Sequence, residues 1–101
     1  MAMSDKPDFL AHDDGDHVAV AVHDVEPGRA PIGYLDGTDA ITLEVLEAVP
    51  LGHKVALTDV AAGDAVIEYQ LPIGRASKSI RTGDYVHTHN VRSIKWQNSV
   101  A

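Results

Sequence analysis

Short stretches in which apolar and polar residues alternate dominate the chain. Residues 41–45 read Ile-Thr-Leu-Glu-Val, a period of two that places one face of a strand inward. Residues 18–22 and 66–69 are also rich in β-branched side chains. Residues 40–48 could form a short helix, but their β-branched content favours a strand. No amphipathic helical stretch of convincing length is found, so the pattern predicts a mostly β protein.

A weak internal repeat supports this prediction. Three segments share the order polar, aliphatic, two residues, Gly; they are residues 24–28, 59–63 and 79–83. The positions four and six residues after each glycine are Ile32 and Tyr34, Ile67 and Tyr69, and His87 and His89. Each unit is interpreted as a tight turn that leads into a strand, with the two later positions on one side of it. Three such copies predict a compact β fold rather than a solenoid.

The third copy differs because histidines replace the Ile and Tyr of the other two. Residues two apart in a strand project to the same face, about 6–7 Å apart. His87 and His89 could therefore present two imidazoles to one metal ion or one substrate carboxylate. Alternatively, both histidines cover a strand face and bond to their neighbours. The amide of Asn90, which follows, could orient an imidazole, bind substrate or simply end the strand.

Two further groups of residues carry positive charge or imidazoles. Gly52-His53-Lys54 combines a flexible backbone position with two groups that can face an anion. The same residues could be an exposed turn that enters a strand at residues 55–57. Arg75 begins a modest basic run with Lys78 and Arg81, which could hold an anionic substrate or lie on the surface.

Composition narrows the class of protein. The 101 residues fit one domain, and the lack of cysteine excludes disulfides and thiolate metal sites. A net charge of -7 argues against nucleic acid as a partner, because phosphate contacts need a basic surface. No apolar run approaches the roughly 20 residues that span a bilayer. The chain is therefore expected to be cytoplasmic, without membrane or nucleic-acid partners.

With these motifs in view, the chain resembles the SAF-type domain of altronate and galactarate dehydratases and of sulfolactate sulfo-lyase, where it is an N-terminal domain or a separate small subunit. The matching stretches are residues 16–22, 49–59, 66–69, 72–76 and 83–90. Gly-His-Lys followed later by Val-His-x-His-Asn is the specific combination. The chain departs from the family at His17, Glu68 and Gln70, where Asn, Lys and Gly are usual; the last two put the turn beside Tyr69 in doubt.

The resemblance implies a fold and a division of the chain. The expected fold is a mostly β, SAF-like β-clip in one small domain at residues 12–96. Residues 1–11 would be a flexible N-terminal segment and residues 97–101 a C-terminal tail. Trp96, near that tail, would pack on the domain or on a partner subunit.

The resemblance also implies a lyase that eliminates water or sulfite from a hydroxylated carboxylate, together with a large catalytic subunit and a divalent metal such as iron or manganese. In this reading His87 and His89 are metal ligands or acid–base groups, and His53 is catalytic. Lys54, Asn90 and Arg75 would bind the substrate. Residues 12–16 and the ending at 92–96 look more like the sulfo-lyase subunit, but the leaving group stays open.

A rival interpretation belongs to another class of function. A free-standing, non-catalytic SAF domain could bind an anionic metabolite or a partner protein, and the chain could form homo-oligomers. A neighbouring gene for a large subunit would favour the enzyme, and an isolated gene would favour the binding module.

Overall fold

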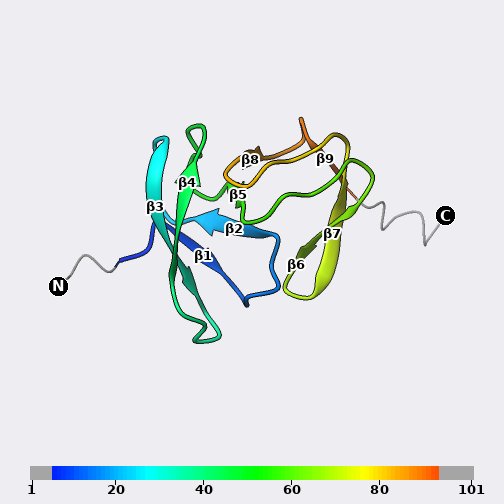
Figure 1. Ribbon diagram of the computed structural model, residues 1–101. Helices are drawn as coiled ribbons and strands as arrows, with labels where there is room; N and C mark the ends of the chain where they lie inside the picture. The colour runs from blue at the N-terminus through cyan, green and yellow to red at the C-terminus, as the bar shows by residue number, and fades with distance from the viewer. Residues whose placement is uncertain (1–5, 94–101) are drawn as a thin grey trace.

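The computed structural model describes residues 6–93, in which nine short strands form two sheets. The strands are β1 (Phe9–Ala11), β2 (Val18–Ala21), β3 (Gly28–Tyr34), β4 (Ile41–Val45), β5 (Lys54–Ala56), β6 (Ala65–Glu68), β7 (Leu71–Ala76), β8 (Tyr85–Val86) and β9 (Val91–Ser93). The larger, curled sheet has the order β4-β3-β1-β2-β5-β8, and the smaller has the order β6-β7-β9 (Figure 1). No helix, and so no membrane-spanning helix, occurs in this range. The mostly β, single-domain prediction is confirmed.

The first strand lies inside the larger sheet. Phe9 is fully buried and pairs with Ala21 of β2 on one side and with Ile32 of β3 on the other. The β1–β3 pairing is parallel, whereas the other strand pairs are antiparallel. The sequence analysis expected the domain to start at His12, after a flexible segment at residues 1–11. The sheet instead begins at Phe9, within that segment. The predicted tail at residues 97–101, and Trp96, lie outside the described residues.

Two apolar clusters hold the sheets. One fills the curl of the larger sheet around Phe9 and Ile32. The other joins the sheets through Val18, Ala56 and Val86 of the larger sheet and Val66, Ala76, Val60 and Ile80. Burying one such aliphatic side chain stabilises a fold by about 1.5–3 kcal/mol. The second cluster therefore fixes the small sheet against the β5–β8 edge of the larger one.

The glycine turns of the sequence repeat are present, but its strands are not equivalent. Gly28, Gly63 and Gly83 all have positive φ, at 134°, 91° and 94°. In the first copy Ile32 and Tyr34 lie in β3, as predicted. In the second, β6 ends one residue before Tyr69. In the third, β8 ends before both histidines. The repeat therefore predicted the turns and the strands that follow them correctly, but Tyr69 and both histidines lie beyond the ends of those strands.

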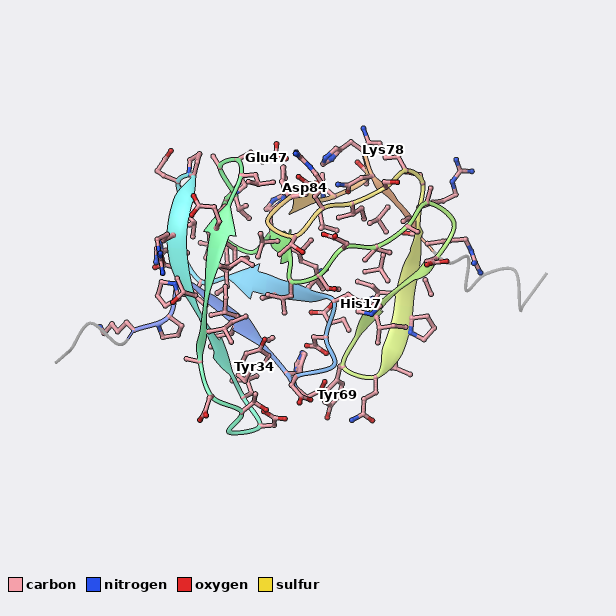
Figure 2. The ribbon with its side chains drawn as sticks, in the orientation of Figure 1. His17, Tyr34, Glu47, Tyr69, Lys78 and Asp84 are labelled. Atoms are coloured by element: carbon pink, nitrogen blue, oxygen red, sulfur yellow. The ribbon has the colours of Figure 1, made fainter. Side chains whose placement is uncertain are left out.

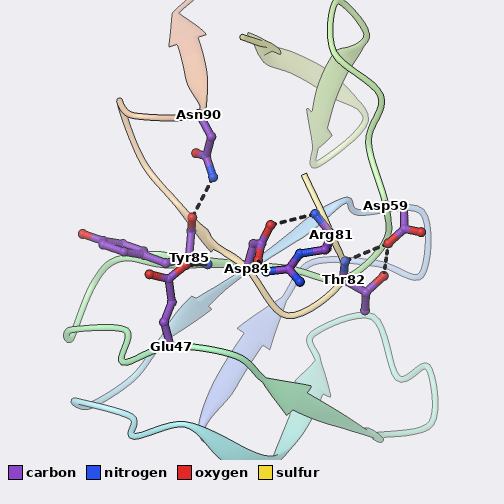
Figure 3. Close-up of polar contacts among 7 residues, drawn as sticks. All are labelled: Glu47, Asp59, Arg81, Thr82, Asp84, Tyr85 and Asn90. Carbon is purple, nitrogen blue, oxygen red and sulfur yellow. Dashed lines mark hydrogen bonds and ion pairs between the residues drawn. The ribbon is translucent and has the colours of Figure 1, made fainter. Parts of the chain in front are cut away.

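The second and third segments of the repeat face each other. Val60 and Ile80 exchange backbone hydrogen bonds of 2.9 and 2.8 Å. Asp59 Oδ1 accepts from the backbone N and the hydroxyl of Thr82, each at 2.8 Å (Figure 3). These two bonds, the backbone one first, lower the pKa of Asp59. Their stabilisation is present above the ordinary carboxyl pKa and is lost as the pH falls through the lowered value.

A two-residue turn joins β6 to β7. Tyr69 and Gln70 have φ of 55° and 66°, as a type I′ hairpin loop requires. The buried Asp16 carboxylate accepts from the backbone N of Tyr69 at 2.8 Å and from that of His12 at 2.8 Å. The Tyr69 ring packs on the His12 ring, with 4.5 Å between the ring centroids; Figure 2 labels Tyr69. Asp16 therefore supports a tight turn although Gln70 replaces the usual glycine.

The turn predicts a stabilising substitution. A non-glycine residue in the left-handed region costs about 1–2 kcal/mol, whereas glycine pays about 0.5–1 kcal/mol in chain entropy. Gln70→Gly is therefore expected to raise stability by about 0.5–1 kcal/mol, or Tm by a few degrees. Thermal unfolding followed by circular dichroism measures this shift. Gln70→Ala, which keeps the Cβ, should leave Tm near that of the wild type; an equal gain from both variants would contradict the explanation.

Candidate functional site

A cleft of about 450 Å³ lies where the two sheets meet. Its polar lining residues are His53, Lys54, Glu68, His87, Thr88 and Ser93. Its apolar lining is Ile73, Val86 and Val91. These residues come from β5 and β8 of the larger sheet and from all three strands of the smaller sheet, together with the loops beside them. The cleft is thus a product of the sheet junction rather than of one strand.

His53 enters the cleft from a closed turn. Gly52 has a φ of 83°, which favours glycine, and the backbone N of His53 donates to the carbonyl of Pro50 at 2.9 Å. The carbonyl of His53 accepts from Ala21 N of β2 at 2.8 Å. Its ring Nδ1 lies 2.7 Å from the hydroxyl of Tyr85. The imidazole is therefore held both by its backbone and by its ring.

The structure brings His87 to His53. Their ring centroids are 4.9 Å apart, and both side chains line the cleft. The His87 ring stacks on Tyr85, with an angle of 4° between the planes and 5.7 Å between centroids. Two imidazoles this close can act on one small substrate.

The expected pairing of His87 with His89 on one strand face is wrong. Strand β8 ends at Val86, and both histidines lie in the loop that follows. His87 lines the cleft, whereas His89 lines a second hollow of about 330 Å³ with Lys78 and Arg81. That hollow lies at the end of the molecule where Figure 2 labels Lys78. A period of two does not hold once the chain leaves the sheet.

The side chain of Asn90 explains where the strand ends. Asn90 is 3% exposed, and its Oδ1 accepts from the backbone N of His87 at 2.9 Å. Its Nδ2 donates to the carbonyl of Tyr85 at 2.8 Å (Figure 3). The backbone N of Val91 also turns back to the carbonyl of His87. The side-chain amide therefore bonds to the backbone on both sides of Val86, where β8 ends, and shapes the loop that follows.

The two cationic candidates, Lys54 and Arg75, lie in different places. Lys54 lines the cleft, and its Nζ lies 3.8 Å from Oε1 of Glu68 across the sheet junction. The two side chains are 33% and 15% exposed. Arg75 is absent from the cleft lining and donates to the carbonyl of Gly63 at 2.8 Å. Lys54 is thus the candidate that faces a substrate, partly neutralised by Glu68.

This ion pair predicts the effect of freeing Lys54. A partly exposed pair contributes about 0.2–1 kcal/mol, so Glu68→Gln should strengthen binding of a small anion by about 2- to 5-fold. An NMR titration of the chain with inorganic sulfate measures the dissociation constant. Glu26→Gln, at an exposed position outside the cleft lining, is the matched control. Unchanged or weaker binding in the Glu68 variant would contradict a competition for Lys54.

Tyr85 was not among the predicted site residues. It is the first residue of β8 and lies two residues before His87, on whose ring its own ring stacks. Its hydroxyl contacts His53, and its ring also lies 5.6 Å from that of His89. Tyr85 therefore contacts or neighbours all three histidines of the region.

Metal binding is limited by the donors present. Within residues 6–93 no group of three or more His, Cys, Asp or Glu side chains could hold a metal ion. His53 and His87 offer two nitrogens where protein metal sites use three or four ligands. The described residues therefore do not fit a complete iron or manganese site.

Comparisons with known proteins find similar sequences. The altronate/galactarate dehydratase SAF domain model matches residues 7–94. The chain is 43% identical to the (2R)-sulfolactate sulfo-lyase subunit alpha of Chromohalobacter salexigens over 91 residues, covering 88% of this chain and 97% of that subunit. It is 44% identical to the altronate dehydratase of Escherichia coli over 78 residues, covering 77% of this chain but 15% of that enzyme. The chain is 38% identical to the galactarate dehydratase (L-threo-forming) of the same organism and covers 14% of that enzyme.

Proposed function

The chain belongs to the altronate/galactarate dehydratase SAF domain family, and we propose that it is the small subunit of a lyase that eliminates sulfite or water from a hydroxylated carboxylate. Its match to 97% of a protein named as a subunit supports this role. It covers only 15% of the altronate dehydratase, so the rest of the catalytic machinery would belong to a large partner subunit. The observation that carries the proposal is the convergence of His53, Lys54 and His87 on one cleft.

The cleft suits elimination next to a carboxylate. Removing a proton beside a carboxylate leaves a concentrated negative charge, which a nearby cation stabilises. Lys54 supplies that cation and faces the substrate carboxylate. Imidazoles are the commonest general acids and bases in enzymes, so His53 and His87 can donate and accept the protons that the reaction moves. A sulfite leaving group needs less help from an acid than hydroxide does.

The proposed site is shared between subunits. The chain's cleft holds two imidazoles, one ammonium group and the Glu68 carboxylate, but no three His, Cys, Asp or Glu side chains within residues 6–93 are placed to hold a metal ion together. A divalent ion such as iron or manganese would therefore take its ligands from the large subunit.

Sulfolactate is the favoured substrate. The chain covers 97% of the sulfo-lyase subunit of Chromohalobacter salexigens, but only 15% and 14% of the two dehydratases. Sulfolactate carries both a carboxylate and a sulfonate. Lys54 is the one lysine or arginine in the cleft lining among the described residues, so a second cation would come from the partner subunit.

Recovery of the partner tests the proposal. The tagged chain is purified from its native cells without chelator, and proteins that accompany it are identified by mass spectrometry. A dehydratase-like or sulfo-lyase-like large subunit in stoichiometric amount is the expected result. Recovery of the chain alone would favour the free-standing module that binds an anionic metabolite and would overturn the subunit assignment.

A further inference from the structure

We infer that Tyr85 is a positioning residue that fixes the tautomer of His53, so that His53 presents an N–H donor to the cleft and the proton acceptor must be another group. The tautomer assignment concerns the chain alone. Its meaning for catalysis rests on the proposed lyase function.

Tyr85 is anchored before it reaches His53. It pairs with Val55 of β5 in the larger sheet. Its backbone N donates to Oε2 of Glu47 at 3.3 Å, and its carbonyl accepts from Asn90 at 2.8 Å (Figure 3). The phenol hydroxyl then lies 2.7 Å from His53 Nδ1, a short distance for a hydrogen bond between oxygen and nitrogen. An anchored ring can hold the imidazole in one orientation.

The phenol O–H can donate or accept, and its strength as a donor favours one direction of this bond. A neutral imidazole has one nitrogen that donates and one that accepts, and a phenol O–H is a good donor. When the Tyr85 hydroxyl donates to Nδ1 of His53, the ring hydrogen must lie on Nε2. Nε2 is on the other edge of the ring, so His53 presents a donor away from Tyr85. This favours contact with an anionic oxygen or a departing group.

His23 shows the opposite arrangement. Its Nδ1 lies 2.7 Å from the carbonyl of Asp24, and its Nε2 lies 2.8 Å from a carboxylate oxygen of Asp8. Both partners are acceptors, so the doubly protonated ring is favoured there. His53 instead faces a hydroxyl, which donates to the neutral ring and accepts from the charged one. Tyr85 can therefore remain bonded when His53 gains or loses a proton.

His87 is the remaining imidazole of the cleft. Its contact with Tyr85 is a parallel stack rather than a ring hydrogen bond. Stacking leaves both ring nitrogens accessible to a substrate. Contact with Tyr85 thus affects the two histidines differently. His53 is the proton donor, and His87 is available as the proton acceptor.

Long-range ¹H–¹⁵N NMR spectra of the full chain, recorded above pH 8 where imidazoles are neutral, test this assignment. The expected wild-type spectrum shows His53 with hydrogen on Nε2 only. His17 is an internal reference, because its Nδ1 accepts from the backbone N of Ile67 at 3.0 Å. In Tyr85→Phe the His53 Nδ1 resonance should shift to that of an unbonded nitrogen while His17 stays unchanged. Tyr69→Phe, at the exposed hairpin turn, should shift neither.

The outcomes separate this inference from the lyase assignment. Hydrogen on Nδ1 of His53 in the wild type, or an unchanged His53 spectrum in folded Tyr85→Phe, would overturn the inference whatever the chain's partner is. The wild-type spectrum alone decides the tautomer if the variant fails to fold. In the assembled enzyme, Tyr85→Phe should lower kcat about 10- to 100-fold with KM within about 3-fold and displace the pH profile of kcat. Unchanged kinetics would show that Tyr85 does not affect catalysis, but would leave the tautomer assignment of His53 intact.

Discussion

A His87→Ala variant should lose about 10²- to 10⁴-fold of kcat in the assembled lyase, the usual range for removing a group that transfers protons. The His87 ring lines the cleft and lies 4.9 Å from that of His53. Its side chain is exposed, so truncation should change the free energy of unfolding by less than about 0.5 kcal/mol. Turnover of the reconstituted enzyme, with Tm measured on the same preparation, checks both parts.

His89→Ala is the matched control for this result. His89 is also exposed and lies in the same loop, but it lines the second hollow rather than the cleft. Its removal is expected to lower kcat by less than about 10-fold, a loss below the usual range for a group that transfers protons. Equal, severe losses in both variants would contradict the separation of the two histidines and restore the original prediction of a paired site.

Gly83→Ala is expected to destabilise the fold by roughly 3–5 kcal/mol. Gly83 has a φ of 94°, and an added Cβ would collide with the backbone carbonyl oxygen of Glu44. That carbonyl belongs to β4, and Leu46, the first residue after β4, donates its backbone N to Gly83 O at 3.0 Å. The backbone therefore has little freedom to move away. Urea denaturation gives the change in the free energy of unfolding.

Gly63→Ala isolates the steric part of this effect. Gly63 has nearly the same φ, 91°, but an added Cβ there meets nothing within 4 Å. The expected loss is only the backbone cost of about 1–2 kcal/mol. If the two alanine variants lose the same stability, the close approach of Gly83 to β4 does not contribute.

Local patterns predicted much of the fold. The alternation at residues 41–45 predicted β4 correctly, because a period of two depends only on neighbouring residues. The glycine turns were also visible, since positive φ selects glycine over other residues. Strand β1 was missed because three residues are too few to establish a period. Its pairing with β3 is set by the packing of the whole sheet.

The site was harder to predict. The Gly-His-Lys motif singled out His53 and Lys54 and the later motif singled out His87, and all three line the cleft. The end of β8 was not foreseen, since it depends on how the buried Asn90 amide bonds to the loop backbone. The Lys54–Glu68 pair and the Tyr85–His53 bond join strands or loops that are distant in sequence. Such contacts require the sheet topology, which periodicity does not contain.

The most direct test of the central claim is sulfite release from sulfolactate, measured for this chain, for the co-purified large subunit and for their mixture. The proposal that the chain supplies part of a shared lyase site predicts turnover only in the mixture. A parallel assay of water elimination from altronate and galactarate identifies the leaving group. A large subunit that releases sulfite from sulfolactate equally well with and without this chain would contradict the claim.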